Sequence, residues 1–570
     1  MRNWRLNTVL FLITIFGAAI ISRLFFLQIL NHKFYQAWAL GQQAGFSEVQ
    51  GQRGEVFFKN SQESKGAYGA GDMKSLAINK ERWQVYLMPQ EIEDKDILSE
   101  LLSKAIGESK EFVLSKIENR DSYTVIKKDL SKEVLEEVKK IKLDGIYWEN
   151  IGGRYYPQEK MASKIIGFLG GDGNGQYGIE GYYDDILKGE AGIKEEKRGL
   201  DLIDFSDVKL DLNGSDIYLT IDYNIQFEAE SLLKEAQKNL NIDSGQIVVL
   251  KPDTGRILAM TDLPSFDPNF YSKEKNLDIF QNSAIQKIFE PGSIMKPFTM
   301  SMGINEGKIT PDTTYVDSGF VKVGLATIYN FDRKKYGQQT MAGVLEKSIN
   351  TGAVFVSQLI SHQTFLGYLD KFGFNKKTGV ELQGEVSLKN DINGPDVEFA
   401  TASFGQGISA TPLQIARGFC VIANGGKLVK PYVVEKIVRG EKETEITPQI
   451  LDKQVISAKT ASQVTTMLTG VVEKGFGKGA KIPGYYLAGK TGTAQVPFEN
   501  KKGYYPDKTI QTFIGFGPAL NPQFLILVKL DNPKVLSSSL SAVPVFRKLA
   551  QYIINYWQIP PDYDVDNENK

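Results

Sequence analysis

Cysteine and histidine are almost missing from this chain of 570 residues, which has one cysteine and two histidines. With Cys420 alone, no disulfide can form within the chain. His32 and His362 add too few ligands for a zinc site, and they do not allow a convincing Ser–His–Asp triad or Cys–His pair. We expect Cys420 to be a buried, small apolar residue. The scarcity of histidine favours lysine as the base for any serine nucleophile.

The sequence also lacks an excess of charge of either sign. It has 67 lysines and arginines and 68 aspartates and glutamates, which give a formal net charge of -1 and a pI near 6.4. This balance gives no electrostatic reason to expect a nucleic-acid partner. A chain of 63.6 kDa should contain more than one domain, with ample material for a large core.

Charge is absent from one long run near the start of the chain, Leu6–Ser22. With Leu24–Leu30 beyond Arg23, the apolar length reaches the ~20 residues that span a bilayer. A cleaved signal peptide would have a shorter apolar core, about 7–15 residues, followed by a small-residue cleavage site. Arg2 and Arg5 predict a cytoplasmic amino terminus. We therefore predict a cytoplasmic stub over residues 1–5, a transmembrane helix over 6–30 and the remaining chain outside the membrane.

The segment Phe289–Pro297 places Ser293 three residues before Lys296. A Pro-Gly pair precedes the serine, as expected where a helix begins, and a proline is tolerated in a first helical turn. Helical residues three apart lie on one face with Cβ atoms roughly 5–6 Å apart, so Lys296 is within reach of the serine proton. Alone, this four-residue pattern is weak, because chance copies are expected in a chain of this length.

Two further motifs strengthen the hypothesis of a catalytic pair. Ser348-Ile349-Asn350 and Lys490-Thr491-Gly492 follow downstream. The order Ser-x-x-Lys, Ser-x-Asn, Lys-Thr-Gly is the signature of penicillin-binding proteins and serine β-lactamases. The chain resembles a class B penicillin-binding protein, closest to the division-specific septal type. Further segments that carry the resemblance are Arg53–Val56, Arg154–Pro157, Gly178–Tyr183, Val248–Met260, Ala402–Ala416, Phe513–Pro518 and Phe524–Leu530.

The resemblance implies a serine-type D,D-transpeptidase that cross-links peptidoglycan stem peptides through an acyl-serine intermediate and releases terminal D-alanine. It implies covalent binding of β-lactams and a single-pass location in the bacterial plasma membrane. The implied catalytic residues are Ser293 as nucleophile, Lys296 as base, Ser348 as proton relay, Asn350 as the group that orients Lys296 or the substrate amide, and Lys490 as second cation. Thr491, Gly492 and Thr493 are implied to bind substrate, with the backbone N–H groups of Ser293 and Thr493 as oxyanion hole. No cofactor or metal is implied.

One competing motif overlaps the third of these. Gly484–Thr491 fits the phosphate-binding pattern G-x-x-x-x-G-K-[ST]. However, Tyr485, Tyr486 and Leu487 are strand-type residues where a flexible loop is needed, and no helical pattern follows to bind phosphates at its N-terminus. We predict a strand, in which Gly492 lets a substrate backbone approach closely.

The order of predicted elements indicates an α+β fold for the second part of the chain. Strands are predicted over 217–221, 245–250, 256–261 and 487–528, with helices over 223–239 and from 293 to about 372. This pattern fits an antiparallel, β-lactamase-like sheet covered by helices. The predicted domains are a mixed α/β pedestal (dimerisation-type) domain over 31–212, a transpeptidase domain over 213–559 and a disordered, acidic tail over 560–570.

The pedestal contains no pattern of nucleophile and base. Amphipathic helices are predicted over 93–143 and a mobile loop over 59–75, and the polar residues of 154–157 and 178–183 are expected to brace this domain. The size of the pedestal favours transpeptidation over β-lactamase or carboxypeptidase activity. The resemblance implies binding to a membrane glycosyltransferase of the shape, elongation, division and sporulation type (SEDS) and to other division proteins. An elongation-specific transpeptidase and a non-enzymatic scaffold of a wall-synthesis complex are the alternatives.

Overall fold

The computed structural model describes residues 11, 13–18, 25, 46–59, 74–118, 124–150, 153–195, 212–498 and 503–564. Most of the predicted transmembrane segment 6–30 and of the predicted mobile loop 59–75 lies outside the described residues. Within the described ranges, no helix has both the length and the apolar character needed to cross a membrane. The chain divides into two compact units, the smaller drawn from Met1–Gly54, Ile186–Ser215 and Arg439–Lys442, and the larger from the other residues.

The smaller unit contains an antiparallel pair of strands, β1 (Phe46–Gln50) and β10 (Ala191–Glu195). Next to this pair the backbone N–H of Gly51 donates to the carbonyl of Glu190 at 2.9 Å. A Cβ atom on Gly51 would lie 1.7 Å from the carbonyl oxygen of Leu212. Only glycine therefore lets these two backbone segments approach so closely.

The larger unit is organised around an antiparallel sheet of five strands. Their order in the sheet is β13 (Ile257–Leu263), β12 (Ser244–Leu250), β24 (Phe524–Asp531), β23 (Tyr504–Gly517) and β22 (Ala488–Pro497). Every neighbouring pair is antiparallel. The predicted α+β class is confirmed.

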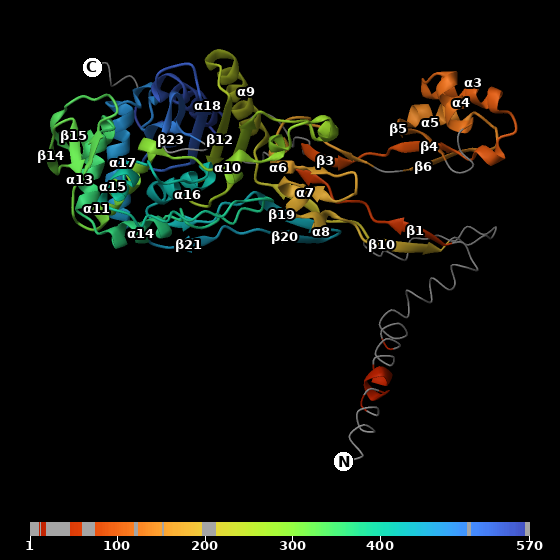
Figure 1. Ribbon diagram of the computed structural model, residues 1–570, viewed down its shortest axis with the longest axis horizontal. Helices are drawn as coiled ribbons and strands as arrows, with labels where there is room; N and C mark the ends of the chain where they lie inside the picture. The colour runs from red at the N-terminus through yellow and green to blue at the C-terminus, as the bar shows by residue number, and fades with distance from the viewer. Residues whose placement is uncertain are drawn as a thin grey trace. The chain divides into compact units, whose positions relative to one another are not determined.

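Helices pack against this sheet (Figure 1). Those that contact its strands are α9 (Tyr223–Leu240), α10 (Ser283–Gln286), α16 (Pro412–Ala423), α17 (Ala458–Glu473) and α18 (Ala542–Tyr556). The same unit also contains α11 (Lys296–Asn305), α12 (Met341–Glu346), α13 (Asn350–Gln358), α14 (His362–Lys371) and α15 (Asp396–Ala402). Alternate residues of β12 and β24, such as Ile247 and Val528, pack with α9 and α18 in one buried cluster. Cys420 lies fully buried in α16, as predicted.

One prediction in this region is wrong in part. Helical patterns were predicted to dominate from 293 to about 372, but four short strands occupy residues 314–340. They are β14 (Thr314–Asp317), β15 (Phe320–Val323), β16 (Ala326–Tyr329) and β17 (Gly337–Thr340), which pair as β14 with β17 and β15 with β16. Gly319, Gly324 and Gly337 have φ of 85°, 58° and 69°, so glycines supply the left-handed turns between these strands.

The first part of the larger unit has a core of its own. Helices α3 (Lys95–Ile106), α4 (Lys110–Glu118) and α5 (Lys132–Lys139) pack on a sheet in the order β5 (Thr124–Leu130), β4 (Trp83–Leu87) and β6 (Ile146–Asn150). The predicted helices over 93–143 are therefore interrupted by β5. Thr124 and Ile126 are buried while their neighbours are more exposed, and this period of two is typical of a strand.

A second sheet contains six strands in the order β20 (Lys442–Glu445), β19 (Val434–Arg439), β11 (Asp216–Leu219), β2 (Val56–Phe57), β3 (Ser75–Asn79) and β7 (Arg154–Tyr155). β2 pairs in parallel with β11 and antiparallel with β3, which in turn pairs with β7.

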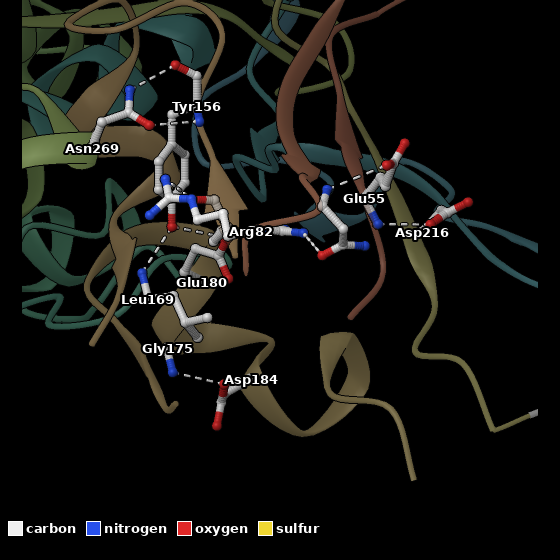
Figure 2. Close-up of polar contacts among 11 residues, drawn as sticks. Glu55, Arg82, Tyr156, Leu169, Gly175, Glu180, Asp184, Asp216 and Asn269 are labelled. Atoms are coloured by element: carbon white, nitrogen blue, oxygen red, sulfur yellow. Dashed lines mark hydrogen bonds and ion pairs between the residues drawn. The ribbon is translucent and has the colours of Figure 1, made fainter. Parts of the chain in front are cut away.

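Polar side chains brace this region, as the sequence predicted (Figure 2). Arg154 forms a buried ion pair with Glu180 of α7 (Gly178–Tyr182), with Nε and Oε1 2.6 Å apart. The Tyr156 hydroxyl accepts from the backbone N–H of Leu169 at 2.8 Å and donates to Glu180 at 3.3 Å. Asn269, in the 3-10 helix η3 (Pro268–Lys273), hydrogen-bonds both the N–H and the carbonyl of Tyr156. The contacts of Asn269 join residues 154–180 to the part of the larger unit that contains the five-stranded sheet.

The C-terminal tail was predicted to be disordered from residue 560. The backbone N–H of Asp562 donates to the carbonyl of Gly484 at 2.8 Å, and the rings of Tyr563 and Tyr486 lie 4.8 Å apart. Residues up to Asp564 are thus part of the packed chain, and 565–570 lie outside the described residues.

Candidate active site

Ser293 lies in a short 3-10 turn, η5 (Gly292–Met295), which runs directly into α11 at Lys296. The α-helix was predicted to begin at the serine, and the structure instead starts it three residues later. In a 3-10 turn the side chains at i and i+3 eclipse one another, so Ser293 and Lys296 still share one side of the chain. Gly292 has φ of 57° and its N–H donates to the carbonyl of Gly405 at 3.0 Å, which fixes the turn.

Lys296 is fully buried at the start of α11. Its Nζ donates to the carbonyl of Ser348 at 2.5 Å, to Ser348 Oγ at 3.2 Å and to Asn350 Oδ1 at 2.8 Å. Within the described residues, the hydrogen bonds of this amine go to Ser348 and Asn350 rather than to Ser293. Burial, and then the positive charge of Lys490, hold the pKa of Lys296 well below its usual value. The lowered pKa favours the neutral form of the amine, which is the form that can act as a base.

Lys490 is the second fully buried lysine, and it lies in β22. Its Nζ donates to Ser348 Oγ at 2.9 Å and to the carbonyl of Thr491 at 3.0 Å. Burial lowers the pKa of Lys490 to about 7. The hydroxyl of Ser348 thus lies within hydrogen-bonding distance of both lysine amines.

Ser348 has an unusual backbone conformation. It lies between the end of α12 and the start of α13, with φ of 53° in the left-handed region. Non-glycine residues avoid this region unless their surroundings hold them there, and such residues cluster at functional sites. The conformation aims both the carbonyl and the hydroxyl of Ser348 at Lys296.

The three motifs meet in one cleft with a volume of about 340 Å³. Five of the predicted site residues line it: Ser293, Ser348, Asn350, Thr491 and Thr493. Lys296 and Lys490 are buried behind this lining. A further cavity, of about 400 Å³, contains none of the motif residues.

Gly492 occupies a different kind of position. A Cβ atom there would lie 2.2 Å from Thr512 Oγ1 and 2.9 Å from Ile294 Cγ2. The missing side chain therefore lets Thr512 of β23 and Ile294 of η5 pack closely against β22. Gly492 brings the nucleophile turn onto the strand that carries Lys490.

Sequence reasoning missed a large part of the cleft lining. The missed residues are Asn330, Phe331, Asp332, Lys334, Tyr336, Lys347, Ile349, Phe404, Gln406, Phe476, Ser537, Ser538 and Ser539. Most come from segments with no motif. Gln406 could have been predicted from the sequence, because it lies in the recognised segment Ala402–Ala416. No local pattern marks Asn330 or the serines 537–539.

The phosphate-binding interpretation of Gly484–Thr491 does not fit the structure. Strand β22 begins at Ala488 and runs through Lys490 to Pro497, with β23 paired along it. No helix N-terminus follows Thr491, so the segment lacks the geometry that binds phosphates. The predicted strand is confirmed.

Comparison with known proteins agrees with this geometry. The family model for the penicillin-binding protein transpeptidase domain matches residues 245–551, and the model for the penicillin-binding protein dimerisation domain matches 51–219. The chain belongs to the class B penicillin-binding proteins. Stage V sporulation protein D of Bacillus subtilis is 33% identical over 475 residues, which cover 80% of this chain and 73% of that protein.

Further relatives of this class B protein include the peptidoglycan D,D-transpeptidase FtsI of Buchnera aphidicola. It is 32% identical, over 82% of this chain and 80% of its own length. The crystal structure of penicillin-binding protein 3 from Mycobacterium tuberculosis, complexed with aztreonam, is 26% identical with a TM-score of 0.69, and the match covers 91% of this chain and 99% of that one. Penicillin-binding protein 2X of Streptococcus thermophilus shares the fold. It is 22% identical with a TM-score of 0.74, and the match covers 90% of this chain and 81% of that one. The predicted family and class of enzyme are confirmed.

Proposed function

We propose that this chain is a peptidoglycan D,D-transpeptidase whose nucleophile is Ser293. The observation that carries the proposal is the hydroxyl of Ser348, which lies 3.2 Å from one buried lysine amine and 2.9 Å from another, in the cleft that Ser293 lines. A serine needs a neutral base to become a nucleophile, and two desolvated lysines beside each other supply one.

Acylation begins when Ser293 Oγ attacks the carbonyl between the two terminal D-alanines of a stem peptide. Lys296 takes the hydroxyl proton as the bond between Oγ and carbon forms. The backbone N–H groups of Ser293 and Thr493 stabilise the oxyanion, and single donors of this kind contribute roughly 3–4 kcal/mol. The carbon–nitrogen bond then breaks, and the leaving D-alanine amine takes a proton that Ser348 passes on from Lys296.

The same groups serve the second half of the reaction in reverse order. An amine from a neighbouring stem peptide attacks the acyl carbon and passes its proton through Ser348 to Lys296. The ester bond to Ser293 Oγ breaks and the serine regains a proton from Lys296, so the cycle neither gains nor loses protons. Asn350, which accepts from Lys296 at 2.8 Å, keeps the amine in place throughout.

The terminal carboxylate of the substrate suits the Thr491 and Thr493 hydroxyls at the cleft wall. Lys490 is buried and its Nζ donates to Ser348 and Thr491, so it attracts the carboxylate from beneath the wall. Ser538 Oγ lies 3.5 Å from Thr493 Oγ1 and adds a hydroxyl at the same end. Gly492 contributes by setting the distance between this wall and the nucleophile turn.

We place the enzyme in septal wall synthesis, because Phe289–Ser293 and Phe404–Gly407 resemble division-specific members and one relative carries the name FtsI. In this proposal residues 6–30 anchor the chain in the plasma membrane, and the region 31–212 contacts a SEDS-type glycosyltransferase and other division proteins. Co-purification of the full-length chain with such a glycosyltransferase tests the last point. Elongation-specific synthesis is the alternative role.

Intact-mass measurement after penicillin treatment tests the function. The full-length chain is expected to gain one acyl group, and Ser293→Ala is expected to gain none at an unchanged melting temperature. Ser301→Ala is the matched control, since Ser301 is a buried serine of α11 whose hydroxyl donates to the carbonyl of Pro297. Acylation of Ser293→Ala at the wild-type rate would rule out the nucleophile, and an unlabelled wild-type chain would favour a scaffold.

A further inference from the structure

A fully buried carboxylate outside the three motifs lies close to them. Asp317, at the end of β14, accepts hydrogen bonds from Thr351 Oγ1 at 2.6 Å, Tyr336 N at 2.7 Å and Gly319 N at 3.0 Å. Both of its oxygens also accept from Asn330 Nδ2, at 3.0 and 3.1 Å. Burial alone would raise the pKa of Asp317, but these bonds lower it below its usual value. The carboxylate is held charged, as a fixed point in the fold.

Asn330 connects this carboxylate to the second motif, Ser348–Asn350, by hydrogen bonds. Its side-chain oxygen accepts from the backbone N–H groups of Asn350 at 3.1 Å and Thr351 at 3.3 Å. These are the first two N–H groups of α13, which have no partner within the helix. The residue that precedes the helix, Ile349, has no side chain that can cap it. Asn330 therefore does from another segment what an N-cap side chain usually does.

The same contact reaches Lys296 through the side chain of Asn350. Asn350 Nδ2 donates to the carbonyl of Tyr329 at 3.0 Å, and its Oδ1 accepts from Lys296 Nζ at 2.8 Å. Residues 329 and 330 thus hold Asn350 by its side chain and by its backbone. Ser348, two residues earlier, keeps its left-handed conformation directly beside this fixed helix start.

We propose that Asp317 and Asn330 are positioning residues for acyl transfer. Asp317 fixes Asn330, Asn330 fixes the first turn of α13, and that turn fixes the oxygens of Ser348 and Asn350 that receive hydrogen bonds from Lys296. The inference rests on the proposed function, because the oxygens it concerns are those of the proposed relay. It extends the catalytic machinery to the small strands over 314–340.

An ordinary helix cap would stabilise the fold and do nothing else. Here the capped helix begins inside the motif, so movement of its first turn displaces the acceptors of the proposed base. A displacement of about 1 Å far from the reacting atoms can lower a rate by about 100-fold. Loss of a helix cap alone would lower only the fraction of folded molecules, whereas loss of a positioning residue would also lower the acylation rate of each folded molecule.

The test compares Asn330→Ala and Asp317→Asn with wild type, as full-length chains in detergent. Three quantities are measured: the second-order rate of acylation by a fluorescent penicillin per folded molecule, the dependence of that rate on pH, and the melting temperature. Asn330→Ala is expected to acylate about 100-fold more slowly, and the isosteric Asp317→Asn about tenfold more slowly, as expected for lost positioning.

The pH profile separates positioning from stability. The oxygens of Ser348 and Asn350 favour the charged form of Lys296, and Lys490 is the charged group that faces it. When these oxygens move away, the acidic limb of the rate profile is expected to shift to lower pH in both variants. A loss of stability alone would lower the folded fraction and leave this limb in place.

Asn424→Ala is the matched control. Asn424, at the end of α16, also hydrogen-bonds three backbone groups: the carbonyl of Pro252 and the carbonyl and N–H of Lys427. It does not line the cleft. It is expected to lower the melting temperature while the rate and the pH profile stay at wild-type values. Wild-type rates and profiles in Asn330→Ala and Asp317→Asn would overturn the positioning role, even at a lowered melting temperature. A wild-type chain without acylation would overturn the proposed function, and this inference with it.

Discussion

Lys164 and Lys296 are both buried lysines of the larger unit, but their neighbours have opposite charge. Lys164, in α6 (Ser163–Ile166), forms an ion pair with Asp262, with Nζ and Oδ2 3.0 Å apart. Lys296 hydrogen-bonds only neutral oxygens among the described residues, and its charged neighbour is Lys490. Burial lowers the pKa of both lysines, but Asp262 opposes the effect at Lys164 whereas Lys490 reinforces it at Lys296.

The charge of the neighbouring group distinguishes a buried cation that stabilises the fold from one that can act as a base. A buried cation beside a carboxylate keeps its charge and holds two segments together, as Arg154 does with Glu180. A buried cation beside another cation tends to lose its proton, which destabilises the folded state but produces a base. We therefore expect changes at Lys296 to alter activity, and changes at Arg154 to alter stability.

The largest expected effect is on acylation, in Lys296→Arg. Arginine cannot lose its proton under these conditions, so the base is removed while a cation remains. The rate of acylation by penicillin is expected to fall by about 100- to 10,000-fold, the usual contribution of a general base. Stopped-flow or gel-based labelling with a fluorescent penicillin measures the rate.

Lys296→Met controls for stability in this experiment. Methionine fills a similar volume without a buried amine, so this variant is expected to be equally inactive but at least as stable as wild type. If either variant kept a tenth of the wild-type rate, the base would have to be another group.

The next effect concerns stability, in Arg154→Met. Removing the guanidinium leaves Glu180 buried without its cation, and breaking such a pair costs about 3–5 kcal/mol. The free energy of unfolding, measured in urea, is expected to fall by this amount. The acylation rate of the molecules that remain folded is expected to stay within about twofold of wild type, because mutations of this kind act on the folded fraction.

The double variant Arg154→Met with Glu180→Gln sharpens the result. It removes both charges, and a large part of the lost stability is expected to return because no unpaired charge is left. A single variant as stable as wild type would show that the ion pair contributes nothing. A slower reaction in the folded molecules would show that Arg154 also acts on catalysis.

The sequence identified the motif residues of the site but not the residues that support them. Ser293, Lys296, Ser348 and Lys490 were found because the order of three short motifs is specific even though each motif alone is weak. The structure then brings Ser293 and Ser348 to one cleft, with Lys296 and Lys490 buried behind its lining. The strands of the main sheet were also predictable, since Ile247 and its neighbours form long apolar runs.

The supporting residues could not be found in this way. Asn330 contacts Asn350 across 20 residues of sequence and Asp317 contacts Thr351 across 34, and no spacing rule connects these pairs. The strands at 314–340 are four residues each, too short for a clear alternation of buried and exposed side chains. The pairing of Lys164 with Asp262 is likewise a tertiary contact, and only the structure distinguishes it from an exposed lysine.

The smallest expected effect is the dependence of stability on pH that Lys490 causes. The pKa of Lys490 is about 7 in the folded chain, whereas an unfolded lysine has a pKa of about 10.4. Between these values the unfolded state binds one more proton, so the free energy of unfolding rises with pH. For one proton the slope is at most about 1.4 kcal/mol per pH unit.

Urea unfolding at pH 7, 8 and 9 measures this slope, and Lys490→Met is expected to reduce it. Burial also raises the pKa of Cys420, which gives a slope of opposite sign at the upper end of this range. Cys420 is present in wild type and in Lys490→Met, so its contribution cancels in the difference between the two slopes. Lys164→Met is the matched variant, and it is expected to change the slope less because Asp262 opposes the fall in the pKa of Lys164. Equal slopes in wild type and Lys490→Met would mean that Lys490 keeps its proton in the folded chain, and the contrast between the two kinds of buried lysine would then rest on Lys296 alone.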